Sequence, residues 1–418
     1  MKRKLAHINA RRAHYPRHRR LGAAKLTVPA VVLVAGVFTV VLAFLFLTPG
    51  AKSDNSAAAD SSAVISTSSN SVAPRIPSKK RAFRVGINFW TGLAEKKGWF
   101  KEAFEPLNAE IEVVDRRVAG GAEAALFKRG DIHIGERMAY PTLQHKANGF
   151  DFVVVAASGE APPRRATTIV RTASTVKTLA DLKGKVLGAH RLGCPYFATY
   201  EALLGAGLQL DTELKKGDVR HVNITGQPAI LALLSGEIEA LSVHLAMPDY
   251  AQLFRDGRIR EIGTALPGGQ YVTNGGRALI VTTRNFANEN PDLIQAYLRV
   301  YERARRYIID EKHYDEAATI SSEQFRTPKD ISLFLVQDAE TRLTLNKIHP
   351  DAQEAVDALK SFLHWAITNG DDFYTTKPLT DAQVEEFVDR RFFAGGQYYV
   401  DTTGTDAQLA APLTLPKQ

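Results

Sequence analysis

Short apolar runs alternate with longer segments of helical periodicity between residues 81 and 282. Most of these runs are followed by a turn that contains Gly, and then by apolar positions at the spacing of one helix face. The apolar runs predict strands at 84–87, 111–114, 132–135, 152–157, 186–189, 219–224, 240–244 and 278–282. Strands that alternate with helices of this length indicate parallel, doubly wound sheets in an α/β protein.

The unit at 179–208 shows this pattern most clearly. A strand at 186–189 leads into a turn at 190–194, and Pro195 then opens a helix, where its missing N–H costs nothing. The amino end of a helix carries unpaired N–H groups and the positive end of the helix dipole, and Arg191 adds a full charge in the same turn. The pattern therefore predicts an anion-binding site at this turn.

Two stretches of the chain share a local pattern of an apolar helix end, Gly, an acid and Ile. They are residues 127–132 and residues 233–238. The repetition is consistent with two lobes built on one plan, although turns from helix to strand converge on the same residue types. We assign 81–172 and 268–418, with the C-terminal helices, to lobe I, and 173–267 to lobe II. The strand at 278–282 is expected to return to lobe I.

An uncharged apolar segment at 28–47 is long enough to cross a bilayer as a helix. Residues 1–26 before it carry nine Lys and Arg and no acid, so the positive-inside rule places this basic tail in the cytoplasm. We therefore predict a single-pass signal anchor at 27–48 in the inner (cytoplasmic) membrane, with the soluble domain extracytoplasmic, in the periplasm. The alternative is a signal peptide that is cleaved near the small residues 57–59.

The formal net charge of +8 comes from the tail alone. Without its nine basic residues, the chain has 44 Lys and Arg against 45 Asp and Glu. The basic balance is therefore no evidence for a nucleic-acid surface, and no nucleic-acid partner is expected. Residues 49–80 are rich in Ser and Ala and predict a flexible linker. Cys194 is the only cysteine, so no disulfide can form within the chain.

Four stretches carry a resemblance to a known family. They read LADLKGKVLGAH at 179–190, YEALLGAGL at 200–208, SGEIEALSV at 235–243 and NFANENPDLIQAYLRVYERA at 285–304. Their order resembles the extracytoplasmic substrate-binding proteins of ABC importers, and within them the aliphatic sulfonate, taurine and nitrate-binding group. The likeness covers residues 84–307, and a weaker helical likeness covers 355–392.

The resemblance implies a two-lobed periplasmic-binding-protein fold, type II-like, with doubly wound sheets, a hinge and C-terminal helices. It implies a monomer that needs no cofactor and binds a small anionic solute. It further implies delivery of that solute to ABC permease and ATPase subunits, while the N-terminal helix provides the contact with the membrane. A membrane-anchored sensor or adaptor of the same fold is an alternative.

Candidate ligand contacts are the residues at the ends of the predicted strands, where a cleft between the lobes is expected. They are Asn88, Phe89, Trp90, Gly120, Gly121, Glu136, Arg137, Arg191, Gly193, Cys194, Tyr196, Thr225, Gln227, His244 and Asn274. For Phe89 and Trp90, packing in the core is the competing explanation.

The charged candidates point to an anion. Arg137 and Arg191 are expected to come from opposite lobes, and guanidinium groups bind planar or tetrahedral anions through several N–H groups. Glu136 beside Arg137 would suit the ammonium group of taurine. However, adjacent residues of an extended backbone point to opposite sides, so only one of the two is expected to face the cleft.

The sequence supports an enzyme less well than a binding protein. Cys194 at a helix amino end, with His190 or His244 as a base, would suit a cysteine hydrolase, but a buried inert thiol explains the same residue. A thiamine-pyrimidine synthase shares the fold, yet the cysteine-rich stretch typical of that group is absent from this sequence. The eleven His show no clustered spacing for a metal. We therefore predict a binding protein without an enzymatic activity.

Overall fold

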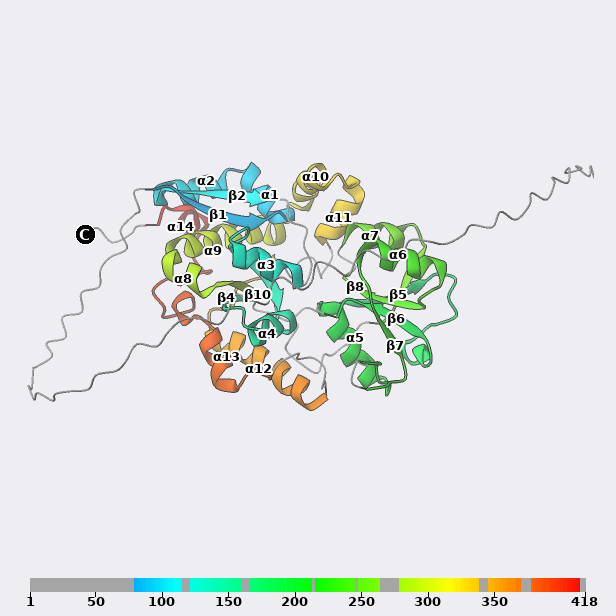
Figure 1. Ribbon diagram of the computed structural model, residues 1–418. Coiled ribbons are helices and arrows are strands. Elements are labelled where there is room, and N and C mark those ends of the chain that lie inside the picture. Colours follow the sequence, from blue (N-terminus) through cyan, green and yellow to red (C-terminus); the bar gives the residue numbers. More distant parts are fainter. Residues whose placement is uncertain are drawn as a thin grey trace, which may run out of the picture. The chain divides into compact units, whose positions relative to one another are not determined.

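The computed structural model describes residues 79–114, 121–158, 166–191, 193–212, 215–244, 247–263, 278–337, 345–369 and 377–413. Two mixed five-stranded sheets organise these residues (Figure 1). The first sheet has the order β2-β1-β3-β10-β4, with β1 Arg81–Gly86, β2 Ala109–Val114, β3 Ile134–Met138, β4 Phe152–Ala157 and β10 Ala278–Thr283. The second has the order β7-β6-β8-β5-β9, with β5 Thr167–Arg171, β6 Val186–Ala189, β7 Arg220–Asn223, β8 Ala240–Val243 and β9 Ile259–Gly263.

The two sheets have the same topology. In each, three parallel strands are followed by one antiparallel strand from elsewhere in the chain: β10 lies between β3 and β4, and β5 lies between β8 and β9. The prediction of parallel sheets therefore holds for β2-β1-β3 and for β7-β6-β8, and it is wrong for β10 and β5. The pairing of β5 with β8 and β9 also places 167–171 in the second sheet, whereas the predicted boundary assigned these residues to lobe I. The predicted return of the chain to the first sheet through β10 is confirmed.

Helices cover the sheets. Those that follow strands of the first sheet are α1 Phe89–Lys96, α2 Trp99–Phe104, α3 Gly121–Arg129, α4 Ala139–Ala147, α8 Arg284–Glu289 and α9 Pro291–Arg305. Those of the second sheet are α5 Cys194–Gly205, α6 Gly226–Ser235 and α7 Pro248–Arg255, drawn in green in Figure 1. The C-terminal helices are α10 Tyr314–Phe325, α11 Lys329–Gln337, α12 Ala352–Asn369, α13 Asp381–Phe387 and α14 Asp406–Ala410. We call the elements of each sheet, with the helices that follow its strands, the first lobe and the second lobe.

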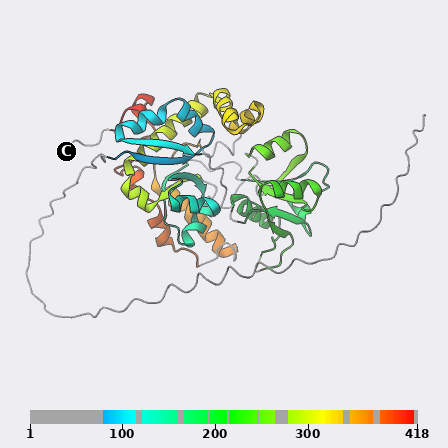
Figure 2. The ribbon, with the colours of Figure 1, turned by 45° about the horizontal axis from the view of Figure 1, so that its top comes forward.

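Aromatic side chains fill the core of the first lobe. The ring of Phe83 on β1 lies 5.2 Å from that of Phe104 and 5.6 Å from that of Tyr297, so β1 is packed against both α2 and α9. In the turned view, β1 runs alongside β2, as their parallel pairing requires (Figure 2). Burial of a large apolar side chain contributes about 1.5 to 3 kcal/mol. This cluster therefore fixes the sheet edge at which β1 ends.

Two C-terminal helices contact the second lobe. Phe362 and Trp365 of α12 pack their rings 4.6 Å and 5.2 Å from the ring of Phe197 on α5. On α11, Asp330 forms an ion pair with Arg255 of α7. The segment after β10 thus touches both lobes.

One predicted strand end is wrong. The pattern predicts a strand at 132–135 with Glu136 and Arg137 beyond its end, but β3 runs from Ile134 to Met138 and α4 begins directly at Ala139. Glu136 and Arg137 therefore lie inside a strand. A charged residue after a short apolar run is typical of a strand end, and only the pairing partners show that the strand continues. The prediction therefore ended the strand too early.

Predictions about the N-terminus lie outside the described residues, because the tail 1–26, the anchor 27–48 and most of the linker 49–80 precede residue 79. Within the described ranges, no helix combines the length and the apolar composition that crossing a membrane requires.

Candidate functional site

The carboxyl ends of β6, β7 and β8 meet at one edge of the second sheet, because these three strands are parallel. Each strand leads into a helix: β6 into α5, β7 into α6 and β8 into α7. Ligands of open α/β sheets bind outside such an edge. The predicted contacts Arg191, Gly193, Cys194, Thr225 and His244 all lie in the connections between these strands and helices, or at the first residue of a helix.

The amino ends of these three helices have no side-chain cap among the described residues. At α5 the capping position is Gly193, which has no side chain, and the second helical residue is Pro195, which has no N–H. The N–H of Gly193 donates to the carbonyl of His190 over 2.8 Å, and that of Tyr196 donates to the carbonyl of Gly193 over 3.1 Å. The N–H of Cys194 donates to no acceptor among the described residues.

Arg191 is held in place through its backbone. Its N–H donates to Oδ1 of Asn223 over 3.0 Å, and its carbonyl accepts a hydrogen bond from the hydroxyl of Tyr140 on α4. The Arg191 side chain is half-buried. The turn after β6 therefore presents a positioned cation beside the positive end of the α5 dipole.

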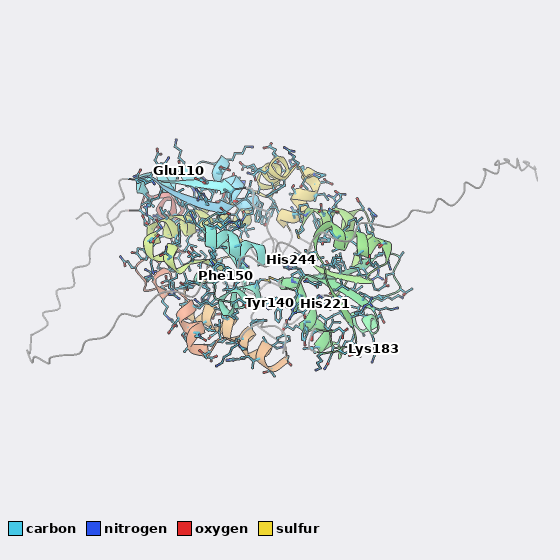
Figure 3. The ribbon with its side chains drawn as sticks, in the orientation of Figure 1. Glu110, Tyr140, Phe150, Lys183, His221 and His244 are labelled. Atoms are coloured by element: carbon cyan, nitrogen blue, oxygen red, sulfur yellow. The ribbon has the colours of Figure 1, made fainter. Side chains whose placement is uncertain are left out.

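The neighbouring His190 is expected to stay neutral. Burial lowers its pKa from the usual 6.5, because the imidazolium form loses hydration. Tyr196 is buried, with its ring 4.9 Å from that of His221. Figure 3 labels His221, together with Tyr140 and His244. Tyr196 thus packs the second lobe, and the charge of the turn comes from Arg191.

The other candidates of the second lobe have defined places. Gln227 donates from Nε2 to Oδ2 of Asp249 over 3.0 Å, which links the first turns of α6 and α7. Thr225 caps α6 only with its extended backbone, and His244 directly follows β8. Gly120 and Asn274 lie outside the described residues, and Gly121 opens α3.

In the first lobe, Asn88 caps its own helix. Its Oδ1 accepts from the N–H of Trp90 over 3.1 Å and from that of Thr91 over 2.9 Å. Phe89 and Trp90 are buried, and the Trp90 ring lies 5.4 Å from Tyr297 and within the same aromatic cluster. The structure therefore places both aromatic residues in the core, as the competing explanation proposed.

Glu136 and Arg137 point to opposite faces of the first sheet. The carboxylate of Glu136 accepts from the hydroxyl of Tyr297 over 3.1 Å, and burial together with this negative charge raises the pKa of Tyr297. Arg137 is only 6% exposed, with its guanidinium 5.9 Å and 5.7 Å from the ring centres of Phe127 and Phe152. Arg137 is therefore a buried core residue inside β3, whereas the sequence placed it beyond the end of a strand.

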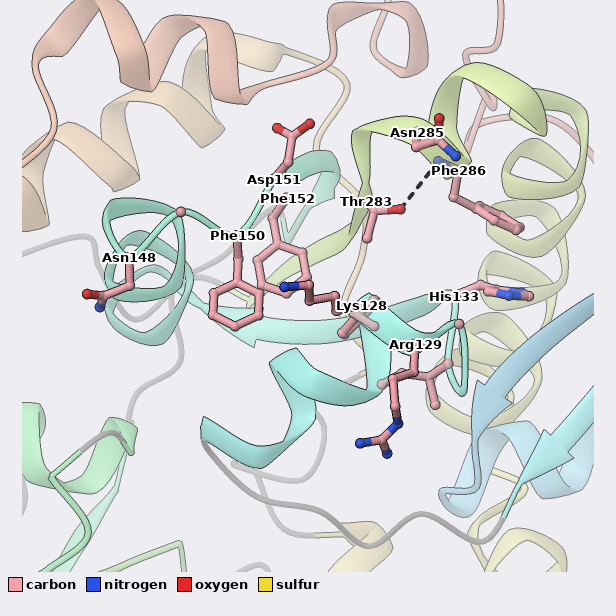
Figure 4. Close-up of a pocket in the computed structure, with 14 residues that line it drawn as sticks. Lys128, Arg129, His133, Asn148, Phe150, Asp151, Phe152, Thr283, Asn285 and Phe286 are labelled. Atoms are coloured by element: carbon pink, nitrogen blue, oxygen red, sulfur yellow. Dashed lines mark hydrogen bonds between the residues drawn. The ribbon is translucent and has the colours of Figure 1, made fainter. Parts of the chain in front are cut away.

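A cavity of about 580 Å³ lies at the other end of the first sheet, where β3 and β4 begin (Figure 4). Its lining includes Lys128, His133, Phe150, Asp151 and Phe286. It is an open hollow lined by both charges and by aromatic rings. The strand-end candidates of the described chain do not line it, so it is separate from the site at α5.

The described residues contain no group of three or more His, Cys, Asp or Glu side chains that could hold a metal ion. The sequence did not indicate the side-chain contacts of Asn223 and Tyr140 to the backbone of Arg191, nor the buried hydroxyls of Thr168, Thr199 and Ser242 that connect α5 to β5 and β8. The only signal of the hydroxyls is a small polar residue inside an apolar run, which is too common to single out a site.

A family model and a curated protein are similar to this chain. The family model described as NMT1/THI5 like matches residues 91–313. A curated protein of Escherichia coli (strain K12), named for binding aliphatic sulfonates, is 26% identical over 177 residues, which are 42% of this chain and 50% of that protein. The match thus spans about half the length of the curated relative.

Solved structures share the fold. The alkanesulfonate-binding protein SsuA from Xanthomonas axonopodis pv. citri, bound to MOPS, superposes with a TM-score of 0.60 at 17% identity, over 75% of this chain and 99% of that one. The periplasmic aliphatic sulphonate binding protein SsuA from Escherichia coli gives a TM-score of 0.57 at 19% identity, over 74% and 98%. At these identities the likeness establishes the two-sheet periplasmic-binding-protein fold.

Proposed function

This chain belongs to the NMT1/THI5-like family, and we propose from that premise that it is the solute-binding component of an ABC importer. In this proposal it captures a small organic anion at the carboxyl edge of the second sheet and delivers it to a permease with its ATPase. The names of the sulfonate-binding relatives support this assignment. The observation that carries it is the uncapped amino end of α5 beside Arg191.

The chemistry of that turn selects an anion. The N–H of Cys194 and the dipole of the twelve-residue helix α5 supply partial positive charge, and Arg191 supplies a full one. A hydrogen bond to a charged group contributes about 1.5 to 3 kcal/mol. Because Asn223 and Tyr140 hold both backbone groups of Arg191, little ordering is required when the anion binds.

An aliphatic sulfonate is the substrate class that we propose. A sulfonate presents three oxygens in a tetrahedral head group, which suits one backbone N–H and a forked guanidinium together. Taurine also needs a partner for its ammonium group. Glu136 is a poor partner, since its carboxylate accepts from Tyr297 inside the first lobe. Nitrate would use the same donors without an alkyl tail, so it belongs in the test as a smaller competitor.

We also propose that the second lobe begins with β5 at Thr167, because β5 pairs with β8 and β9.

We further propose that residues 27–48 anchor the protein in the membrane with both lobes outside. The anchor proposal rests on the uncharged apolar segment and the basic tail. A reporter fused after Gln418 should be extracytoplasmic, and the protein should stay in the membrane fraction after a high-salt wash. Release of an N-terminally shortened soluble form would instead support signal cleavage.

The binding proposal is tested with a panel of ethanesulfonate, MOPS, taurine, nitrate, acetate and succinate. Binding to the folded state alone stabilises it by about 2.7 kcal/mol at a hundredfold excess over Kd, so a true ligand should raise Tm. Calorimetric titration then gives Kd. The proposal fails if no sulfonate raises Tm or binds saturably, and turnover of any panel compound would replace it with an enzymatic function.

A further inference from the structure

Three buried hydroxyl groups form a continuous chain beneath the amino end of α5. Oγ1 of Thr168 lies 3.2 Å from Oγ1 of Thr199, which contacts Oγ of Ser242. Ser242 in turn donates to the carbonyl of Pro195 over 2.7 Å. The three residues are 1%, 3% and 4% exposed, respectively. Pro195 follows Cys194 directly, so the chain ends one residue from the unused N–H of the anion site.

The direction of every hydrogen bond in this chain is fixed. A hydroxyl has one hydrogen to donate. Because Ser242 donates its hydrogen to Pro195, Thr199 must donate to Ser242, and Thr168 must then donate to Thr199. Each hydroxyl thus donates to the next, and removal of the middle one leaves the buried Thr168 hydroxyl without its acceptor and the Ser242 hydroxyl without its donor.

The chain joins three elements. Thr168 lies on β5, Thr199 on α5 and Ser242 on β8, and Thr168 and Ser242 are opposite each other in the antiparallel pair of β5 and β8. A helix that packs only through apolar contacts can slide or rotate slightly at small cost. Here a shift of α5 would break directed bonds in a buried place, which leaves polar groups unpaired.

We infer that this hydroxyl chain is the positioning device of the anion site. It fixes the Cys194 N–H and the end of the α5 dipole relative to the turn that carries Arg191. Thr168, Thr199 and Ser242 are positioning residues, because they act on the ligand through the first turn of α5. The inference rests on the proposed function, since it concerns the affinity of that same site.

The experiment compares Ser242→Ala and Thr199→Val with wild type, using ethanesulfonate and MOPS as probes in calorimetric titration. Both variants should raise Kd by about tenfold, which corresponds to about 1.4 kcal/mol. Thr199→Ser keeps the hydroxyl and should restore Kd to within about twofold of wild type. Thr168→Val removes only the far end of the chain and should have a smaller effect than Ser242→Ala.

Thr282→Val is the matched control for loss of stability alone. Thr282 is 0% exposed, and its hydroxyl donates to the carbonyl of His133 over 2.6 Å in the first lobe. This variant should lower Tm as Thr199→Val does, but Kd should not change.

Four outcomes decide the inference. A higher Kd in Ser242→Ala and Thr199→Val, with an unchanged Kd in Thr282→Val and rescue in Thr199→Ser, supports it. Equal Kd in wild type and both variants overturns it while the proposed function stands. If Thr199→Val does not fold, the Kd values of Ser242→Ala and Thr199→Ser decide whether the inference holds. If wild-type protein binds neither sulfonate, the proposed function fails and the inference falls with it.

Discussion

The two lobes begin equivalent helices in different ways. β1 and β6 hold the same place in their sheets, and α1 and α5 follow them. At α1, Oδ1 of Asn88 accepts from the N–H groups of the second and third helical residues, and the Thr91 hydroxyl accepts from the N–H of Asn88 in return. At α5, Gly193 offers no side chain and Pro195 removes the equivalent donor.

This difference has a functional consequence. A capped helix end satisfies its own donors and contributes to stability, whereas an uncapped one keeps a donor and a dipole end for a ligand. The shared topology therefore does not make the amino ends of α1 and α5 equivalent. On this comparison, the anion contacts that we propose belong to the second lobe.

The largest effect on stability is expected from Arg137 in the first lobe. Arg137→Ala should lower the free energy of unfolding by about 2 to 4 kcal/mol, because it removes a buried side chain that packs against the rings of Phe127 and Phe152. Urea unfolding at pH 7 measures this change. A stability equal to wild type would mean that Arg137 does not support the core of the first lobe.

Acid should weaken the first lobe through His145. Burial, assisted by the positive charge of Arg137, lowers the pKa of His145 from 6.5 to about 4. Unfolding therefore takes up a proton between these two values, so the stability is complete above pH 6.5 and falls as the pH decreases toward 4. The loss for this one group at pH 5 is on the order of 2 kcal/mol.

The measurement is the free energy of unfolding at pH 7 and pH 5 for wild type and His145→Gln. The variant should lose less stability between the two pH values, since Gln does not titrate. Identical losses in both proteins would assign the acid sensitivity to other groups.

Arg191→Ala should act on binding and leave the fold intact. Loss of a charge-assisted contact should raise the Kd for ethanesulfonate about tenfold or more, while the Tm of the unliganded protein stays nearly unchanged, because the substitution keeps the backbone N–H and carbonyl of Arg191 that Asn223 and Tyr140 bind. Titration calorimetry and a melting curve separate the two effects. An unaltered Kd would remove Arg191 from the site.

Installing a cap at α5 should make the second lobe resemble the first. Gly193→Asp places a carboxylate at the helix end, where it competes with the ligand and repels it, so the Kd for ethanesulfonate should rise about fivefold to tenfold. Gly193→Ala is the control for crowding, since its Cβ would lie 3.2 Å from the carbonyl oxygen of His190. If the two variants bind equally, the added charge is irrelevant.

Removing the cap of α1 should have the smallest effect. Asn88→Ala should lower the free energy of unfolding by about 1 kcal/mol, the usual cost of losing a helix cap, and should leave the Kd for ethanesulfonate unchanged. A substantial rise in Kd at constant stability would instead support Asn88 as a ligand contact.

Much of the fold could be predicted from sequence, because its strand signals are local. The predicted strand 152–157 coincides with β4 and 186–189 with β6, since continuous apolar runs between turns indicate buried strands. The order of strand, Gly turn and Pro-started helix likewise located the turn with Arg191 and Gly193 at the amino end of α5. These features depend on neighbours within a few residues.

The tertiary structure alone decided the features that depend on distant partners. The direction of β5 and β10 follows from pairing with strands far away in the chain, and no pattern within either strand encodes it. The sequence placed Arg137 at the end of a strand, and only the tertiary structure shows it buried inside β3 against the rings of Phe127 and Phe152. The hydroxyls of Thr168, Thr199 and Ser242 are separate in the sequence and meet only when β5, α5 and β8 pack, because directed hydrogen bonds between buried groups exist only once long-range packing has set their distances.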